Sequence, residues 1–138
     1  MNVTYKNPPG CAPAQGLYSH ATVINSGTTV FIAGQLSVGA DGAVVGKGSF
    51  ERQFAQVFRN LGDVLEGLGG SYADVVKFST FLVHSQDIEQ FMVLRRELFP
   101  TLFPGGVYPP NTLLVVDRLV KEEFVIEVEA VAAITAPR

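Results

Sequence analysis

The strongest pattern along the chain is a run of apolar side chains at helical spacing. These residues recur every three or four positions, as on the buried face of an amphipathic helix, and they are Phe50, Phe54, Val57, Phe58, Leu61, Val64, Leu65 and Leu68. Ser49 is a typical N-cap, and Gly69-Gly70 is a typical helix end. We therefore predict a helix over residues 49–68 that covers one face of a sheet.

A second amphipathic stretch follows Ser85 and Asp87, and either residue is a candidate N-cap. Its apolar positions are Ile88, Phe91, Met92, Leu94, Leu98 and Phe99. We expect Pro100 to end this helix, because proline has no N–H and its ring clashes with the preceding turn. Arg95 and Arg96 lie within the helix, and we expect both to be solvated.

Segments rich in β-forming side chains predict about six strands. Residues 18–25 and 29–35 are separated by Ser26-Gly27-Thr28, a pattern typical of a hairpin. The other expected strands are residues 43–45, 75–83, 112–119 and 124–134, and residues 3–5 are a candidate short strand within the N-terminal arm, outside this count. A polar turn at residues 120–123 joins the last two.

The element order is ββ(β)αβαββ, which predicts an α+β fold with a mixed sheet and both helices on one face. The uncovered sheet face would then carry apolar side chains such as Phe78, Phe81 or Leu114. An exposed apolar sheet face usually has a partner, and a closed homo-oligomer is the simplest one. At 138 residues, we expect one domain, with residues 1–16 as an extended N-terminal arm.

Composition excludes several classes of function. A net charge of −3, with no run of Lys or Arg, argues against a nucleic-acid partner. Cys11 is the only cysteine and His20 and His84 are the only histidines, so we expect no disulfide and no zinc site. No apolar stretch approaches the ~20 residues of a membrane span, and no secretory signal is visible. We expect a cytoplasmic protein with no membrane partner.

Glu127 and Glu129 lie two residues apart in an otherwise apolar strand, so both point to the same face. A carboxylate among apolar neighbours costs free energy unless it is solvated, paired or used. Two interpretations stay open. Both glutamates are solvated on one strand face, or Glu127 lies in an apolar cleft, where a raised pKa suits an acid or base. We expect Glu129 to be structural, with Lys77 or Arg118 as a candidate partner.

Several local patterns, taken in order, resemble the RidA/YjgF family, also called the endoribonuclease L-PSP family. They are Gly16-Leu17-Tyr18-Ser19, Val30-Phe31-Ile32-Ala33-Gly34-Gln35, Asp41-Gly42, residues 64–69, residues 74–82 and Pro109-Pro110 followed by Ile126-Glu127-Val128-Glu129-Ala130. The resemblance implies a chorismate-mutase-like fold and a homotrimer with small-molecule clefts between subunits. Active members hydrolyse enamine and imine intermediates to 2-oxo acids and ammonia, without a metal or organic cofactor.

The resemblance also assigns roles to individual positions. The glutamate that handles water falls on Glu127. The cleft tyrosine falls on Tyr18, which is otherwise an ordinary half-buried strand aromatic, and the cleft backbone falls on Ala33 and Gly34. His20 follows Tyr18 by two residues, so it is either a second polar group near the cleft or a surface histidine.

The family's essential arginine, which grips the substrate carboxylate, falls on Asn111. Arginine offers a charged bidentate fork, whereas asparagine offers a short neutral amide. An anionic 2-imino acid would lose charge-assisted hydrogen bonds worth ~1.5–3 kcal/mol each. Met92 and Leu113 are apolar where the family often has asparagine and cysteine, so the cleft, which includes Thr112, should be more apolar and less cationic. Asn111 as a simple turn residue remains the alternative. Arg95 or Arg96 could replace the arginine only if the helix turned it inward.

Three functional hypotheses follow, in order of preference. The first is a trimeric small-molecule-binding protein of the RidA/YjgF type without 2-imino acid deaminase activity. The second is a cofactor-independent hydrolase or deaminase for an imine, enamine or uncharged amide-like metabolite, in which Glu127 handles water and Asn111 orients a carbonyl or amide. A ribonuclease ranks last, because the sequence pI is about 5.3 and no basic groove is expected.

Overall fold

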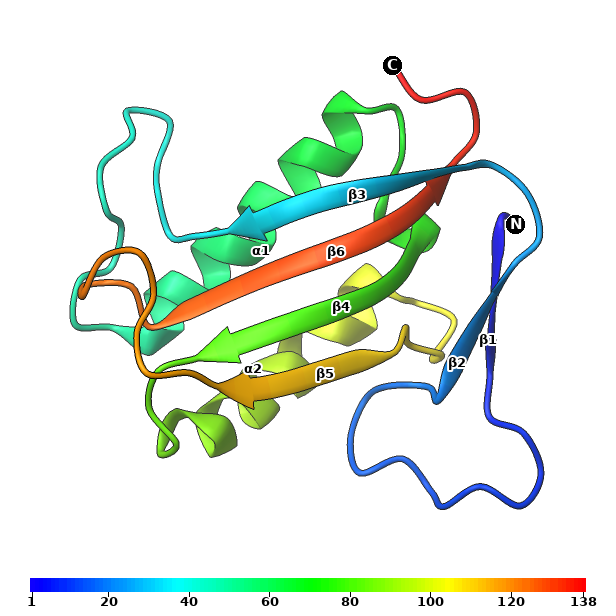
Figure 1. The fold of residues 1–138 in the computed structure, drawn as a ribbon, viewed down its shortest axis with the longest axis horizontal. Helices are drawn as coiled ribbons and strands as arrows, with labels where there is room; N and C mark the ends of the chain where they lie inside the picture. The colour runs from blue at the N-terminus through cyan, green and yellow to red at the C-terminus, as the bar shows by residue number, and fades with distance from the viewer.

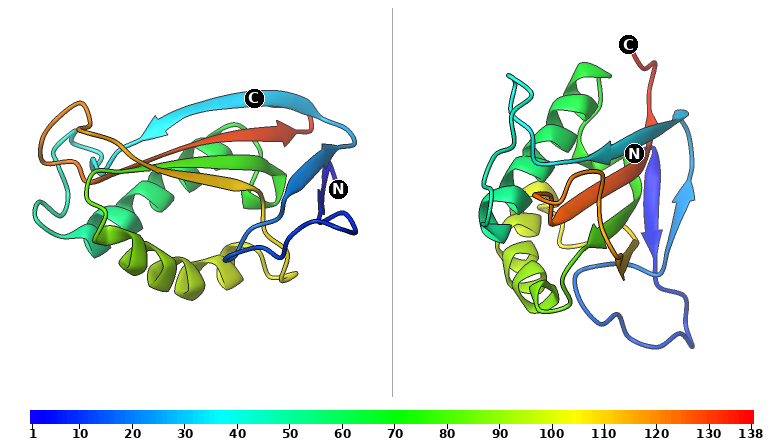
Figure 2. Two further views of the ribbon diagram at one scale, coloured as in Figure 1. Left: turned by 60° about the horizontal axis from the view of Figure 1, so that its bottom comes forward. Right: turned by 60° about the vertical axis from the view of Figure 1, so that its left-hand side comes forward.

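A four-stranded mixed sheet packed on two helices forms the body of the computed structural model, which describes residues 1–138 (Figure 1). The strand order is β3-β6-β4-β5; β6 runs antiparallel to β3 and β4, and β4 and β5 are parallel. Both helices cover the same face of the sheet (Figure 2). The predicted α+β, chorismate-mutase-like fold is therefore confirmed. The elements are β3 (Thr28–Gln35), α1 (Phe50–Gly67), β4 (Val75–Leu82), α2 (Asp87–Leu102), β5 (Asn111–Val115) and β6 (Ile126–Ile134).

The N-terminal strands form a small separate sheet, and the predicted hairpin between residues 18–25 and 29–35 is wrong. β1 (Val3–Lys6) pairs antiparallel with β2 (Ala21–Ile24), whereas β3 pairs with β6. The side-chain amide of Asn2 donates to the Ala133 carbonyl, and the backbone carbonyl of Asn2 accepts from the Asn25 N–H. The first residues of the chain thus occupy the position beside β2 that a hairpin would have given to β3.

Helix α1 matches its prediction closely. The Ser49 hydroxyl accepts a hydrogen bond from the Arg52 N–H at 3.2 Å, as expected of an N-cap. Gly69 follows the helix with φ of +84°, a conformation that glycine adopts without steric cost. The predicted apolar face is directed at the sheet, where Val57, Leu61 and Leu65 are fully buried.

Helix α2 differs from its prediction at both ends. It continues past Pro100 to Leu102, because the missing N–H costs only one intrahelical bond while Phe99 and Phe103 both pack in the core, with ring centroids 5.3 Å apart. Neither Ser85 nor Asp87 is the N-cap. Gln86 is the first flanking residue and makes no capping bond, because backbone bonds from residues 87 and 88 already close the preceding turn.

A β-bulge in β4 determines which of its side chains enter the core. The register with β6 shifts between Val75 and Lys77, so Val75 and Phe78 both face the helices despite their odd spacing. Phe78 is 1% exposed, and its expected place on the uncovered face is wrong. Phe81 and Leu114 do lie in one row of that face, opposite each other in the register of β4 and β5.

The remaining corrections concern strand ends. Residues 43–45 contribute only an isolated bridge between Val38 and Val44. β5 stops at Val115 rather than residue 119, because its partner β4 ends at Leu82. β2 begins only at Ala21, which leaves the preceding residues in a loop. No helix combines the length and the apolar character needed to cross a membrane.

Candidate functional site

Glu127 lies against the backbone of Gly34, on the sheet face that the helices leave uncovered. The register between β3 and β6 shifts between Ile32 and Gln35, which places Ala33 and Gly34 in a bulge. A Cβ atom at Gly34 would overlap the Glu127 carboxylate, so only glycine fits there without displacing that side chain. Three predicted site residues, Ala33, Gly34 and Glu127, therefore lie together within one chain.

The neighbours of Glu127 make it a carboxyl group suited to proton transfer. Phe81 lies opposite it on β4, and Leu114 follows in the same row on β5. Burial raises the pKa of Glu127, and repulsion from the Glu129 charge raises this pKa further. Glu129 is exposed and pairs with neither Lys77 nor Arg118; the one salt bridge of the structure joins Arg118 to Glu122 at 3.6 Å.

The raised pKa gives a prediction for stability against pH. Since the folded-state pKa of Glu127 exceeds the unfolded value, ionisation opposes folding, and stability falls as pH rises through this interval. Glu127→Gln cannot ionise and should be more stable than wild type at neutral pH, with the difference vanishing below about pH 4. Urea unfolding across pH measures this. Glu129→Gln should give a smaller gain in stability at neutral pH, because it removes only the repulsion on Glu127. Identical stability profiles against pH for wild type and Glu127→Gln would contradict the raised pKa of Glu127.

Asn111 is the first residue of β5 and not a turn residue. Its side-chain carbonyl accepts a hydrogen bond from the Thr80 hydroxyl at 2.8 Å, and Thr80 is 1% exposed. This bond fixes the amide and leaves its NH₂ group to donate elsewhere. Thr112 is exposed beside it, and Leu113 packs half-buried against the core. A small surface pocket is lined by Thr22, Val76, Lys77, Phe78, Pro110, Asn111 and Thr112.

Tyr18 and Met92 both lie near Arg95. The Tyr18 hydroxyl accepts from the Gln15 N–H at 3.1 Å, and its ring meets the His20 ring edge-on at 5.9 Å. His20 is exposed, with Nε2 at 2.6 Å from the Ala12 carbonyl oxygen. The Met92 sulfur accepts from Arg95 Nη2 at 3.0 Å.

Arg95 is the candidate that the sequence analysis admitted only if the helix turned its side chain inward, and the structure meets that condition. It is 2% exposed, so the expectation that it is solvated is wrong, while Arg96 is exposed as expected. Its guanidinium lies over the Phe91 ring at 5.2 Å and the Phe99 ring at 6.0 Å. These phenylalanines are four residues before and after Arg95 on the helix, which is the spacing that could have indicated an inward side chain.

The predicted site residues therefore form three groups within one chain. Ala33, Gly34 and Glu127 lie on the uncovered face, and the residues from Asn111 to Leu113 form the start of β5. Tyr18 and Met92 lie on the helix side of the sheet with Arg95. The first and third groups are separated by the sheet itself.

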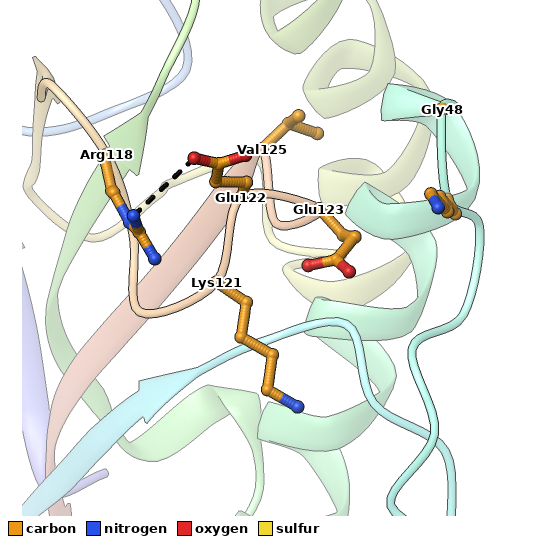
Figure 3. A pocket seen from close by; sticks show the side chains of 7 residues that line it. Gly48, Arg118, Lys121, Glu122, Glu123 and Val125 are labelled. Carbon is orange, nitrogen blue, oxygen red and sulfur yellow. Dashed lines mark ion pairs between the residues drawn. The ribbon is translucent and has the colours of Figure 1, made fainter.

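Another pocket contains none of the predicted site residues. It is lined by Lys47, Gly48, Arg118, Lys121, Glu122, Glu123 and Val125, and it holds the Arg118–Glu122 ion pair (Figure 3). Its side chains carry both signs of charge, and those of Arg118 and Glu122 are 57% and 84% exposed. Exposed ion pairs of this kind contribute little and do not define a ligand site.

The β3 bulge that lies against Glu127, the start of β5 and the mixed sheet define a small α+β protein with a carboxyl group on an open sheet face. The chain belongs to the endoribonuclease L-PSP family, whose model matches residues 10–134.

Similar proteins and a similar solved structure support this family membership. A RutC family protein of Pyrococcus horikoshii is 33% identical over 117 residues, which are 85% of this chain and 86% of the relative. The 2-iminobutanoate/2-iminopropanoate deaminase of Rattus norvegicus is 30% identical over 122 residues, covering 88% and 83%. Among solved structures, YyfB of Yersinia pestis, a conserved Rid family protein of unknown function, superimposes with a TM-score of 0.87 at 33% identity. The match covers 97% of this chain and all of that one.

Proposed function

We propose that this protein is a homotrimeric small-molecule-binding member of the Rid family that lacks 2-imino acid deaminase activity. The observation that carries the proposal is Asn111, which stands at the position that the resemblance assigns to the carboxylate-gripping arginine. Its amide is held by the buried Thr80 hydroxyl, so β5 supplies no positive charge at this position. The similarity to a 2-iminobutanoate/2-iminopropanoate deaminase supports a small-molecule cleft, and the substitution supports the loss of that reaction.

A trimer is supported by the apolar surface of the uncovered sheet face. Phe31 is 80% exposed on β3, and Leu114 is 51% exposed on β5. Side chains of this size on one face are typical of a protein interface. The separation of Glu127 from Tyr18 and Met92 by the sheet also supports a cleft completed between subunits.

Light scattering tests the trimer directly. At micromolar concentration, wild type should have three times the 14.8 kDa mass of one chain. Phe31→Asp should shift the mass toward one chain, because a charge would be buried without a partner in the interface. Val93→Asp is the matched control, since Val93 is exposed on α2, on the opposite side of the sheet. A wild-type mass equal to one chain would contradict the trimer.

A second candidate function is a cofactor-independent hydrolase acting on an uncharged imine, enamine or amide-like metabolite. The raised pKa of Glu127 favours it, because a carboxyl that titrates nearer to neutral pH is a better general acid or base. The free NH₂ group of Asn111 would orient a carbonyl oxygen by donating a hydrogen bond. In this alternative, Glu127→Gln would abolish turnover while ligand binding remained.

A further inference from the structure

Arg95 is a buried guanidinium without an anionic partner. Its Nε atom has no hydrogen-bond partner, and Nη2 donates to the Met92 sulfur, which is a weak acceptor. The one salt bridge of the structure involves Arg118 and Glu122. Removing an unpaired charge from water is costly, so a guanidinium in this state is ready to accept a carboxylate.

A thin segment of backbone covers this guanidinium. Gly16 lies directly on it, and a Cβ atom at that position would overlap Nη2. Gly16 is itself exposed, so little more than its backbone separates the charge from solvent. Every hydrogen bond made by residues 13–18 joins two residues of the same segment. The segment can therefore move off Arg95 without breaking a hydrogen bond to the rest of the protein.

Two residues assigned to the ligand cleft by family resemblance adjoin Arg95. The Met92 sulfur accepts a hydrogen bond from Arg95, and Tyr18 is close enough to affect the pKa of Arg95. Burial lowers the pKa of Arg95, and the Tyr18 phenol acts in the opposite direction. Asn111 removes a positive charge from β5, while Arg95 places one on α2 beside other cleft residues.

We propose that Arg95 is the carboxylate anchor of the ligand cleft and that the ligand is a small monocarboxylic acid. This inference rests on the proposed small-molecule-binding function and names its ligand class. The Arg95 fork can form paired hydrogen bonds with a carboxylate, and the rings of Phe91 and Phe99 exclude water around them. An acid held by Arg95 has its carboxylate at α2 rather than at β5. The 2-carbon of the bound acid then does not lie next to Glu127, where the resemblance places it in the deaminating members.

Isothermal titration with pyruvate and its neutral amide, pyruvamide, tests the anchor. Wild type should bind pyruvate about tenfold or more tightly than pyruvamide, because only the acid forms charge-assisted hydrogen bonds. Arg95→Met should weaken pyruvate binding about tenfold or more and leave pyruvamide binding unchanged. Arg96→Met is the matched control, since Arg96 is the exposed neighbour on the same helix, and it should bind pyruvate as wild type does.

The stability of Arg95→Met separates ligand binding from folding. Arg95→Met should be at least as stable as wild type, because it replaces an unpaired buried charge with an apolar side chain of similar length. A folded Arg95→Met protein that binds pyruvate as tightly as wild type would overturn the inference.

Different results refute the Arg95 anchor, the carboxylate ligand class and the proposed function. If wild type binds pyruvate and Asn111→Ala alone weakens it, the anchor is refuted while small-molecule binding stands. If wild type binds pyruvamide as tightly as pyruvate, or binds neither, the carboxylate ligand class is refuted. The proposed function itself fails on a single-chain mass or on wild-type deaminase activity.

Discussion

Asn111→Arg should introduce 2-imino acid deaminase activity, raising the rate of pyruvate release from dehydratase-generated 2-aminoacrylate by roughly ten- to a hundredfold over wild type. A single charge-assisted hydrogen bond is worth about 1.5–3 kcal/mol, and about 1.4 kcal/mol corresponds to a factor of ten in rate. The arginine fork would bind the substrate carboxylate at β5, which is the position that the resemblance gives to this group. Product release is followed in a coupled assay.

The variant also removes the acceptor of a buried hydroxyl, so its controls address folding. Thr80 donates to Asn111, and losing this bond should cost about 1–3 kcal/mol of stability. Adding Thr80→Val removes the Thr80 hydroxyl, which would otherwise be buried without its acceptor. Asn111→Lys supplies charge without the fork and should gain less activity. If the folded trimer of the Asn111→Arg, Thr80→Val double variant gains no activity, position 111 does not explain the difference from deaminating members.

Phe78→Ala should lower the free energy of unfolding by about 3–5 kcal/mol, the range typical of a large aromatic removed from a packed core. Phe78 is 1% exposed, and its ring lies 5.9 Å from Phe58, 5.8 Å from Phe99 and 6.3 Å from Phe103. These contacts join β4 to both helices, so the cavity would lie where the two layers meet.

Urea denaturation measures this loss. Val93→Ala is a suitable control, because Val93 is 44% exposed on α2 and should cost much less. A loss below about 1 kcal/mol for Phe78→Ala would contradict the bulge in β4, since that bulge is what turns Phe78 toward the helices.

Local patterns predicted both helices and the bounds of α1 well, but they predicted the ends of α2 and the strand pairing poorly. The apolar spacing from Phe50 to Leu65 and the Ser49 cap depend on neighbours within a few residues, and both were correct. The predicted hairpin was wrong because β2 pairs with β1, which lies about fifteen residues earlier in the chain. The short spacing between β2 and β3 does not reveal this pairing. Likewise, nothing local to Phe78 reveals the bulge that reverses its direction.

The candidate site was predicted in its parts but not in its arrangement. Alternation along β6 correctly placed Glu127 and Glu129 on one face, and Gly34 does meet Glu127. Arg95 was expected to be solvated because of its charge, and its inward orientation was only the alternative, whereas its spacing from Phe91 and Phe99 places it on the buried face of α2. Tertiary packing decided its position, since a segment before Tyr18 covers the guanidinium.

The most direct test of the central claim is a coupled assay of wild type with a serine/threonine dehydratase that generates 2-aminoacrylate. The rate of 2-oxo acid release is followed with and without the protein, at a concentration at which light scattering shows a folded trimer. We predict no acceleration over the spontaneous rate, because Asn111 offers no charge to the substrate carboxylate at β5. Acceleration that disappears in Glu127→Gln would contradict the account and make the protein a deaminase with a different carboxylate anchor.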